Sequence, residues 1–140
     1  MILVDVGVWL AALWGRHVHH PAARQWFDAQ SDDLVLCRVT QLNLLRLVTN
    51  PAIMREDTLT RSEAWRVFDQ LWSDERVLMA EEPDGLEAVF RALSARHDRS
   101  HKLWTDGYLA AFAQASGASL ATLDSKLKER YPSVRVEHLA

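Results

Sequence analysis

The sequence predicts an α/β fold, a three-layer α/β/α sandwich built on a five-stranded parallel sheet. Short apolar segments alternate along the chain with longer segments of helical periodicity. The apolar segments are continuous rather than interrupted by polar residues at every second position, as in parallel strands that helices cover on both faces. The length of 140 residues suits one domain, and the sequence contains no repeat and no linker. We therefore expect a single domain over residues 1–140.

The first half of the chain alternates between two predicted strands and four predicted helices. Residues 1–4 (MILV) and 34–37 (LVLC) are short, apolar and β-prone, so we predict buried strands there. Pro21 suits the first turn of a helix, and Thr40 suits an N-cap whose helix ends before Pro51. The predicted helices lie at 8–14, 19–30, 40–50 and 59–73.

The second half repeats the alternation up to the end of the chain. The predicted strands are 77–80 (VLMA), 119–123 (SLATL) and 134–139 (VRVEHL), and the predicted helices are 83–97 and 105–116. Gly117 follows the last helix, in the position where helices commonly end. Trp26, Trp65 and Trp72 lie on the apolar stripes of their helices, so we expect them in the core or at an interface.

Composition excludes several classes of protein. Hydrophobic residues make up 49% of the chain and charged residues 25%, which allows a packed core without disulfides. Cys37 is the only cysteine, which excludes an internal disulfide framework and fits a cytoplasmic protein. We see no leader and no apolar segment of membrane-spanning length, so we expect no membrane contact. A net charge of −3 means that any contact with RNA needs a local basic patch or a bound metal ion.

Three acids occupy the positions where an α/β sheet places its ligands. Asp5 ends the first predicted strand, Asp124 ends the fourth, and Asp106 opens the helix that leads into the fourth. In open α/β sheets the ligand crevice lies outside the carboxyl ends of the strands, where the strand order reverses. We therefore expect Asp5, Asp106 and Asp124 to meet at one crevice.

Three neighbouring carboxylates repel one another unless a cation lies between them. Mg²⁺ prefers hard oxygen ligands, and at a phosphodiester it activates water and stabilises negative charge. The three acids thus predict metal-dependent cleavage of phosphodiesters. Structural roles stay open for each acid: Asp124 as a helix N-cap, Asp106 at the positive end of its helix, and Asp5 as a cap of the turn before Val8.

Four segments, in this order, resemble the PIN-domain nucleases, and specifically the VapC-type toxins of bacterial toxin–antitoxin pairs. MILVDVGVWLAAL resembles the opening strand of that family with its first acid, and HVHHPAARQWF resembles its second helix. CRVTQLNLLRLVTNP is similar to the segment after the second strand. LWTDGYLAAFAQASGASLATLDSKL resembles the closing signature, with two acids eighteen residues apart. The resemblance covers nearly the whole chain.

The resemblance implies an endoribonuclease with a five-stranded parallel sheet that depends on Mg²⁺ or Mn²⁺. It implies that Asp5, Asp106 and Asp124 are the catalytic acids and the metal ligands. It also implies a cognate VapB-type antitoxin that blocks the site, an RNA substrate and, commonly, a homodimer.

Two departures from the family pattern affect this expectation. Many members carry a glutamate in the segment that here reads TQLNLLR, where Thr40, Gln41 and Asn43 supply no carboxylate. An amide can accept a hydrogen bond from a metal-bound water but supplies no charge, so we expect weaker metal affinity. Members also often carry a small polar residue two positions after the first acid, where this chain has Gly7.

Further residues are candidates for supporting roles around these acids. Thr105 and Ser125 adjoin two of the acids and, with Gln41 and Asn43, could orient them or a water molecule. Arg46 lies one helical turn from Asn43, where it could contact phosphate or pair with an acid.

The segment SARHDRSHKLW, at 94–104, is a candidate RNA-binding loop. Arg96, Arg99 and Lys102 lead directly toward Asp106 and could guide RNA phosphates to the site. An ordinary solvated loop is the alternative interpretation. Of the six tryptophans, Trp104 is the candidate for stacking on a base. His17, His19 and His20 do not have the spacing of common zinc sites, so we expect a loop and a helix start there.

Two other classes of function stay open. The first is a catalytically weakened domain that binds RNA or an antitoxin without cutting, which the missing glutamate motivates. The second is an aspartyl-nucleophile phosphohydrolase of the dehalogenase type, with Asp5 as nucleophile. Gly7 counts against the second, because those enzymes carry an Asp-x-Asp motif after the first strand and Gly7 stands where the second acid should be. Cys37, in a predicted buried strand, is a poor candidate nucleophile.

Overall fold

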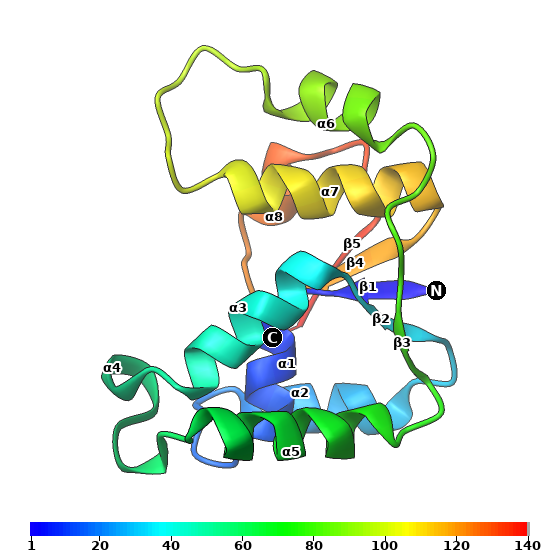
Figure 1. Cartoon of the computed structure of the whole chain (residues 1–140). Helices are drawn as coiled ribbons and strands as arrows, with labels where there is room; N and C mark the ends of the chain where they lie inside the picture. Colours follow the sequence, from blue (N-terminus) through cyan, green and yellow to red (C-terminus); the bar gives the residue numbers. More distant parts are fainter. Residues whose placement is uncertain (140) are drawn as a thin grey trace.

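A computed structural model describes residues 1–139 of the chain and confirms the predicted α/β class (Figure 1). Strands alternate with helices in the order β1 (Ile2–Val4), α1 (Val6–Leu13), α2 (His20–Ala29), β2 (Leu34–Leu36), α3 (Arg38–Val48), α4 (Pro51–Met54), the 3-10 helix η1 (Arg55–Asp57), α5 (Arg61–Trp72), β3 (Val77–Met79), α6 (Leu86–Ser94), α7 (Trp104–Ser116), β4 (Ser119–Thr122), α8 (Leu127–Arg130) and β5 (Val136–His138).

The five strands form one parallel sheet in the order β3-β2-β1-β4-β5. The chain first builds the sheet outward from β1 through β2 to β3, and then returns to add β4 and β5 on the other side of β1. The order therefore reverses between β1 and β4, which pair in register with Leu3 opposite Leu120. This junction is where a ligand site is expected in an open α/β sheet.

Helices cover both faces of the sheet, which explains why β1 and β2 are apolar at every position. Ile2 and Val4 pack into a core under α1, α2, α3 and α5, whereas Leu3 packs into a second core under α6, α7 and α8. Figure 1 shows α6 and α7 on one side of the sheet and α1, α2 and α5 on the other. Because successive side chains of a strand point to opposite faces, both faces of β1 must be apolar.

Local sequence signals fix several helix ends. Thr60 and Glu63 form a reciprocal capping box at the start of α5, with both hydrogen bonds at 3.1 Å. Pro21 lies in the first turn of α2, as predicted. Gly117 ends α7 with a φ of 72°, a left-handed conformation that only glycine adopts at little strain.

The prediction that Thr40 is an N-cap is wrong. Helix α3 begins at Arg38, directly after β2, so Thr40 lies inside the helix and is buried. Its hydroxyl lies 3.4 Å from the Sγ atom of Cys37. The short helices α4, η1 and α8 were not predicted, because each has too few residues for a periodic apolar pattern.

The edge of the sheet is less buried than the predicted pattern implies. Leu78, on the edge strand β3, is 42% exposed.

The predicted core or interface tryptophans lie mostly outside the core. Trp65 and Trp72 on α5 are 49% and 44% exposed, so neither belongs to the core of the chain. Trp26 is only partly buried, and its Nε1 donates a hydrogen bond to Glu137 at 2.7 Å.

None of the helices within residues 1–139 is both long and apolar enough to span a membrane.

Candidate active site

Asp5 lies at the point where the strand order reverses. Its backbone N–H donates to the carbonyl of Ala121 at 2.9 Å, which continues the pairing of β1 with β4 by one residue. One carboxylate oxygen accepts from the backbone N–H of Val6 at 2.7 Å, so Asp5 caps α1. The structural interpretation of Asp5 is therefore correct as far as it goes. The cap uses only one of the two carboxylate oxygens.

Thr122 connects Asp5 to Asp124. It is the last residue of β4 and is fully buried. Its hydroxyl donates to the second oxygen of Asp5 at 3.0 Å and accepts from the backbone N–H of Asp124 at 3.0 Å. Thr122 thereby orients the carboxylate of Asp5 and the backbone of Asp124, and this role was not predicted from the sequence. The available signal was a hydroxyl at the end of an apolar strand, two residues before an acid.

Arg130 joins the other two acids. Its Nη1 lies 3.3 Å from Oδ2 of Asp106 and 3.1 Å from Oδ2 of Asp124. Asp106 is in the first turn of α7, whereas Arg130 is the last residue of α8. Asp124 also accepts from the backbone N–H of Lys126 at 2.9 Å, in a local turn. Arg130 was not predicted from the sequence either, because nothing in the segment LKER distinguishes it from a surface cation.

The acids are not electrically balanced by this arginine. Burial raises the pKa of Asp5, and the charge of Asp124 adds to that effect although the hydrogen bonds from Thr122 and Val6 oppose it. Burial also raises the pKa of Asp106, as do the charges of Asp5 and Asp124, and Arg130 only partly compensates. One guanidinium thus contacts only two of the three carboxylates, and the remaining negative charge favours the arrival of a further cation.

The chemistry of these donors fits a hard divalent cation, although their present arrangement does not enclose one. Carboxylate oxygens are the ligands that Mg²⁺ prefers. Within residues 1–139, no group of three or more His, Cys, Asp or Glu side chains is arranged so that it could hold a metal ion. The guanidinium of Arg130 bridges two of the three acids instead. A metal ion would therefore compete with Arg130 for the same carboxylates.

Predicted supporting residues differ in where the structure places them. Asn43 and Arg46 line a hollow of about 300 Å³ together with Val6, the neighbour of Asp5. Gln41 is buried, and its amide oxygen accepts a hydrogen bond from Arg38. Thr105 is half-buried and Ser125 is exposed. Among the described side chains, the hydroxyl that hydrogen-bonds to one of the three acids is that of Thr122.

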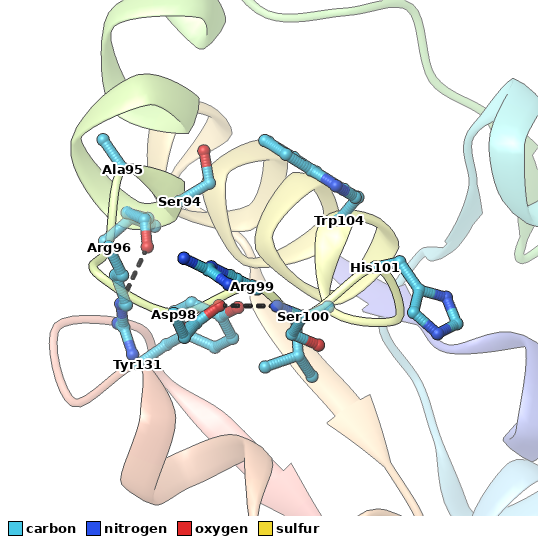
Figure 2. A pocket seen from close by; sticks show the side chains of 11 residues that line it. Ser94, Ala95, Arg96, Asp98, Arg99, Ser100, His101, Trp104 and Tyr131 are labelled. Atoms are coloured by element: carbon cyan, nitrogen blue, oxygen red, sulfur yellow. Dashed lines mark hydrogen bonds between the residues drawn. The ribbon is translucent and has the colours of Figure 1, made fainter.

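The basic segment before α7 lies next to this site. Arg96 donates to the backbone carbonyl of Arg130 at 2.6 Å and stacks over the ring of Tyr131, with its guanidinium carbon 5.0 Å from the ring centre. Arg96 and Arg99 line a hollow shown in Figure 2, and Lys102 is exposed beside it.

The three N-terminal histidines form no metal site. His20 is the first residue of α2, and its Nδ1 lies 2.7 Å from the carbonyl of Ala11. The rings of His17 and His19 are 5.8 Å apart. Burial lowers the pKa of His17, and the nearby His19 and His20 lower it further. The prediction of a loop and a helix start is confirmed.

Residues 2–131 match the family model described as the PIN domain. The chain is 40% identical to Ribonuclease VapC41 of Mycobacterium tuberculosis over 146 aligned positions, which cover 100% of this chain and 99% of that relative. It is 29% identical to Ribonuclease VapC29 of the same organism, over 96% of this chain and 94% of the relative.

Solved structures of low sequence identity share the fold. VapC20 of Mycobacterium tuberculosis, described as a sarcin–ricin loop cleaving toxin, superposes with a TM-score of 0.69 at 16% identity, over 92% of this chain and 94% of that one. VapBC2 of Rickettsia felis, bound to a DNA fragment from its promoter, gives a TM-score of 0.72 at 15% identity over 100% of both chains. FitAcB of Neisseria gonorrhoeae gives 0.66 at 22% identity, over 97% of this chain and 96% of that one.

Proposed function

The chain belongs to the PIN-domain family, and from that premise we propose that it is a VapC-type endoribonuclease toxin that needs a divalent metal ion to cut RNA. The observation that carries the metal requirement is the set of three carboxylates at the β1–β4 junction that only Arg130 partly neutralises. The ribonuclease assignment is supported by the full-length similarity to Ribonuclease VapC41. We propose that residues 1–140 form one such domain.

Asp5, Asp106 and Asp124 would hold the metal ion, Mg²⁺ or Mn²⁺. When bound, such an ion lowers the pKa of a water ligand and stabilises negative charge on the phosphate. In the hydrolysis a water oxygen forms a bond to phosphorus, a P–O ester bond breaks, and the departing ribose oxygen takes up the proton that the water loses. Thr122 would keep Asp5 and Asp124 in position during this step, because it is hydrogen-bonded to both residues.

The remaining residues contribute positive charge and polar contacts. Arg46 and Asn43 would meet the substrate beside Asp5, while Arg96, Arg99 and Lys102 would meet it beside Asp106. Contacts of this kind position a nucleic-acid backbone without reading its sequence. Gln41, Thr105 and Ser125 would act on the acids or on water rather than on the substrate.

The experiment is RNA cleavage by the purified chain with and without metal. We expect cleavage in Mg²⁺ or Mn²⁺, none in excess EDTA, and none by Asp5→Asn, which keeps an oxygen that can cap α1 but lacks the charge. Asp69→Asn, a change at an exposed acid on α5, is the matched control and retains activity. Equal cleavage by the Asp5→Asn protein would overturn the proposal.

The structural neighbours VapBC2 and FitAcB support an antitoxin as the protein partner. We propose that a VapB-type antitoxin blocks the site and that the toxin is a homodimer. We also propose that toxin and antitoxin act in the cytoplasm, where the RNA substrate is found. Co-expression of the chain with its adjacent reading frame, followed by size-exclusion chromatography with light scattering, measures the stoichiometry. A monomeric chain that its neighbour neither binds nor inhibits would contradict this part.

A non-cutting RNA- or antitoxin-binding domain is the second candidate. It is favoured by the absence of a ready-made metal arrangement within residues 1–139 and by the amides of Gln41 and Asn43 where many relatives carry a carboxylate. Calorimetric titration with Mg²⁺ distinguishes the two, because the nuclease requires measurable affinity at millimolar metal. A dehalogenase-type role for Asp5 has no support, since Gly7 occupies the position of the required second acid.

A further inference from the structure

A hollow of about 340 Å³ is lined by residues that are close in the chain to Asp106 and Arg130 (Figure 2). Its walls are the end of α6, the loop at residues 95–103, the first turn of α7, and Tyr131. This volume is within the range of pockets that bind small ligands. We refer to it as the loop pocket.

Two walls of the loop pocket belong to residues that are near members of the candidate active site in the chain. Trp104, on one wall, lies two residues before Asp106 in the first turn of α7. Tyr131, on another wall, directly follows Arg130, whose side chain contacts Asp106 and Asp124. An RNA strand with one phosphate at the acids therefore has a neighbouring nucleotide within reach of the pocket.

Arg96 is a fixed part of the pocket wall. Besides its bond to the carbonyl of Arg130, its Nε donates to the carbonyl of Leu93 at 3.1 Å, and its guanidinium covers the ring of Tyr131. These contacts tie the loop to α6 and α8 at once. The pocket is thereby held open in a defined shape rather than formed by a free loop.

Arg99 supplies a cation that has no acidic partner among residues 1–139. It is exposed, and in the view of Figure 2 its side chain lies below those of Ser94 and Trp104. The one acid on the wall, Asp98, accepts a hydrogen bond from the backbone N–H of Ser100 at 3.0 Å. A guanidinium presents a planar fork that matches the oxygens of a phosphate, so Arg99 suits the phosphate of a nucleotide.

Trp104 supplies an aromatic surface on the same pocket. It is 59% exposed, although its ring is held edge-on against Phe90 with the ring centres 6.3 Å apart and an angle of 77° between the planes. A large apolar ring that is fixed in orientation yet open to solvent is suited to stacking on a base. Sequence-tolerant stacking of this kind is how proteins bind unpaired nucleotides.

We propose that the loop pocket binds one unpaired nucleotide of the RNA substrate, with its base on Trp104 and its phosphate on Arg99. The proposal rests on the proposed function and adds to it a binding site for one nucleotide of the substrate. A base inside a duplex is stacked and paired, so it cannot enter a pocket of this kind. The enzyme would therefore select single-stranded segments or loops over duplex RNA.

The test measures binding, without cleavage, in an Asp5→Asn background. Fluorescence anisotropy would follow a labelled single-stranded RNA of about 12 nucleotides and the same strand in a duplex. We expect Trp104→Ala to weaken binding of the single strand about 10-fold while duplex binding is unchanged. Trp104→Phe should restore most of the loss, because it keeps an aromatic ring.

Matched controls come from α5, which lies on the other side of the sheet. Trp65→Ala and Arg61→Gln remove an exposed tryptophan and an exposed arginine there, and neither should change RNA binding. Arg99→Gln should weaken binding to both forms of RNA and lower the slope of log affinity against log salt by about 0.7 for the single strand.

The outcomes separate this proposal from the proposed function. If the wild-type chain cleaves RNA with metal but Trp104→Ala binds the single strand normally, the loop pocket has no such role and the nuclease stands. The proposal is also overturned if the background protein binds no single-stranded RNA, or if Trp104→Ala weakens duplex binding equally. If binding depends on Trp104 but the wild-type chain never cleaves RNA, the pocket stands and the nuclease fails.

Discussion

Two arginine–aspartate clusters in this molecule have similar exposure, but they differ in the ratio of acidic to basic side chains. Arg76 binds Asp74 through two hydrogen bonds of 3.0 and 2.7 Å, and these side chains are 25% and 30% exposed. Arg130 binds Asp106 and Asp124, and these side chains are 26%, 25% and 39% exposed. Exposure therefore does not distinguish the two clusters.

What differs is the number of acids for each guanidinium. The hydrogen bond from Arg76 lowers the pKa of Asp74, and Asp74 in turn raises the pKa of Arg76. At the other cluster the pKa of Asp106 is raised in spite of Arg130, because the carboxyl is buried near Asp5 and Asp124. The first cluster is a balanced structural ion pair. The second is an unbalanced site that a further cation would stabilise, and each of the following predictions tests that contrast.

The largest expected difference is in catalysis. Asp106→Asn should lower kcat/KM for RNA cleavage by at least about 100-fold, the upper end of the loss seen when a residue that only orients a metal ligand is removed. Asp74→Asn should leave it nearly unchanged, since Asp74 contacts Arg76 and no part of the site. Single-turnover cleavage at saturating metal measures both. A comparable loss in the two variants would remove the functional contrast between the clusters.

The next difference is in stabilisation by metal. When Mn²⁺ is present at about 100 times its Kd, the free energy of unfolding of the wild-type chain should rise by about 2.7 kcal/mol. Asp74→Asn should show the same increase, because the site is intact. Asp106→Asn should show about 1.4 kcal/mol or less, as a Kd at least 10-fold weaker implies. Urea unfolding with and without metal gives these values. An increase in Asp106→Asn as large as in the wild type would contradict the assignment.

A smaller effect is expected from breaking the balanced cluster. Arg76 also donates to the backbone carbonyls of Phe27 and Gln30 at 2.7 and 2.8 Å and stacks over the ring of Phe27. Arg76→Ala should therefore lower the free energy of unfolding by about 2 kcal/mol, as expected for lost hydrogen bonds to a charged group. Arg24→Ala, which breaks an exposed ion pair with Asp28 within one helix, is the control. Equal losses in the two variants would show that Arg76 is an ordinary surface charge.

The smallest difference is in the dependence of stability on pH without metal. The native pKa of Asp5 lies above the ordinary 3.8, so between these two values the folded protein binds more protons than the unfolded chain. Stability contributed at Asp5 therefore falls as pH rises through that window and recovers in acid. For Asp74 the native pKa lies below 3.8, so its contribution is present above 3.8 and is lost as pH falls.

Thermal unfolding in EDTA, at pH values from about 4 to about 7, tests this sign. The Tm of Asp5→Asn relative to the wild type should increase with pH, because the variant carries no buried charge. The difference in Tm between Asp74→Asn and the wild type should stay nearly constant over this range, because the contribution of Asp74 is already present above 3.8. A pH-independent difference for Asp5→Asn would mean that the carboxylate of Asp5 is not destabilised by its surroundings.

The acids were predictable because their positions follow from the strands. Short, mainly apolar segments identify β1 and β4. Asp5 and Asp124 lie one and two residues after these strands, which places them at the carboxyl edge of a parallel sheet. Asp106 could be added because it opens the helix that leads into β4. For these acids, the local sequence and the topology of the sheet both predict a position at the β1–β4 junction.

The contacts between the acids could not be predicted in the same way. Arg130 reaches Asp106 across 24 positions through α8, which has only four residues and no periodic pattern. From the sequence alone Thr122 cannot be told from any other strand residue, because its hydrogen bond to Asp5 depends on β4 lying beside β1. The exposed rings of Trp65 and Trp72 leave only the interface half of their prediction open, since an apolar stripe on a helix does not reveal how much of it the sheet covers.

The most direct test of this account is a Mn²⁺ titration followed by electron paramagnetic resonance, which detects the free ion. We predict saturable binding by the wild-type chain, binding weakened at least about 10-fold in Asp106→Asn, and tighter binding in Arg130→Gln, where the competing guanidinium is gone. Indistinguishable affinities in the three proteins would contradict the claim that Asp106 holds the metal ion in competition with Arg130.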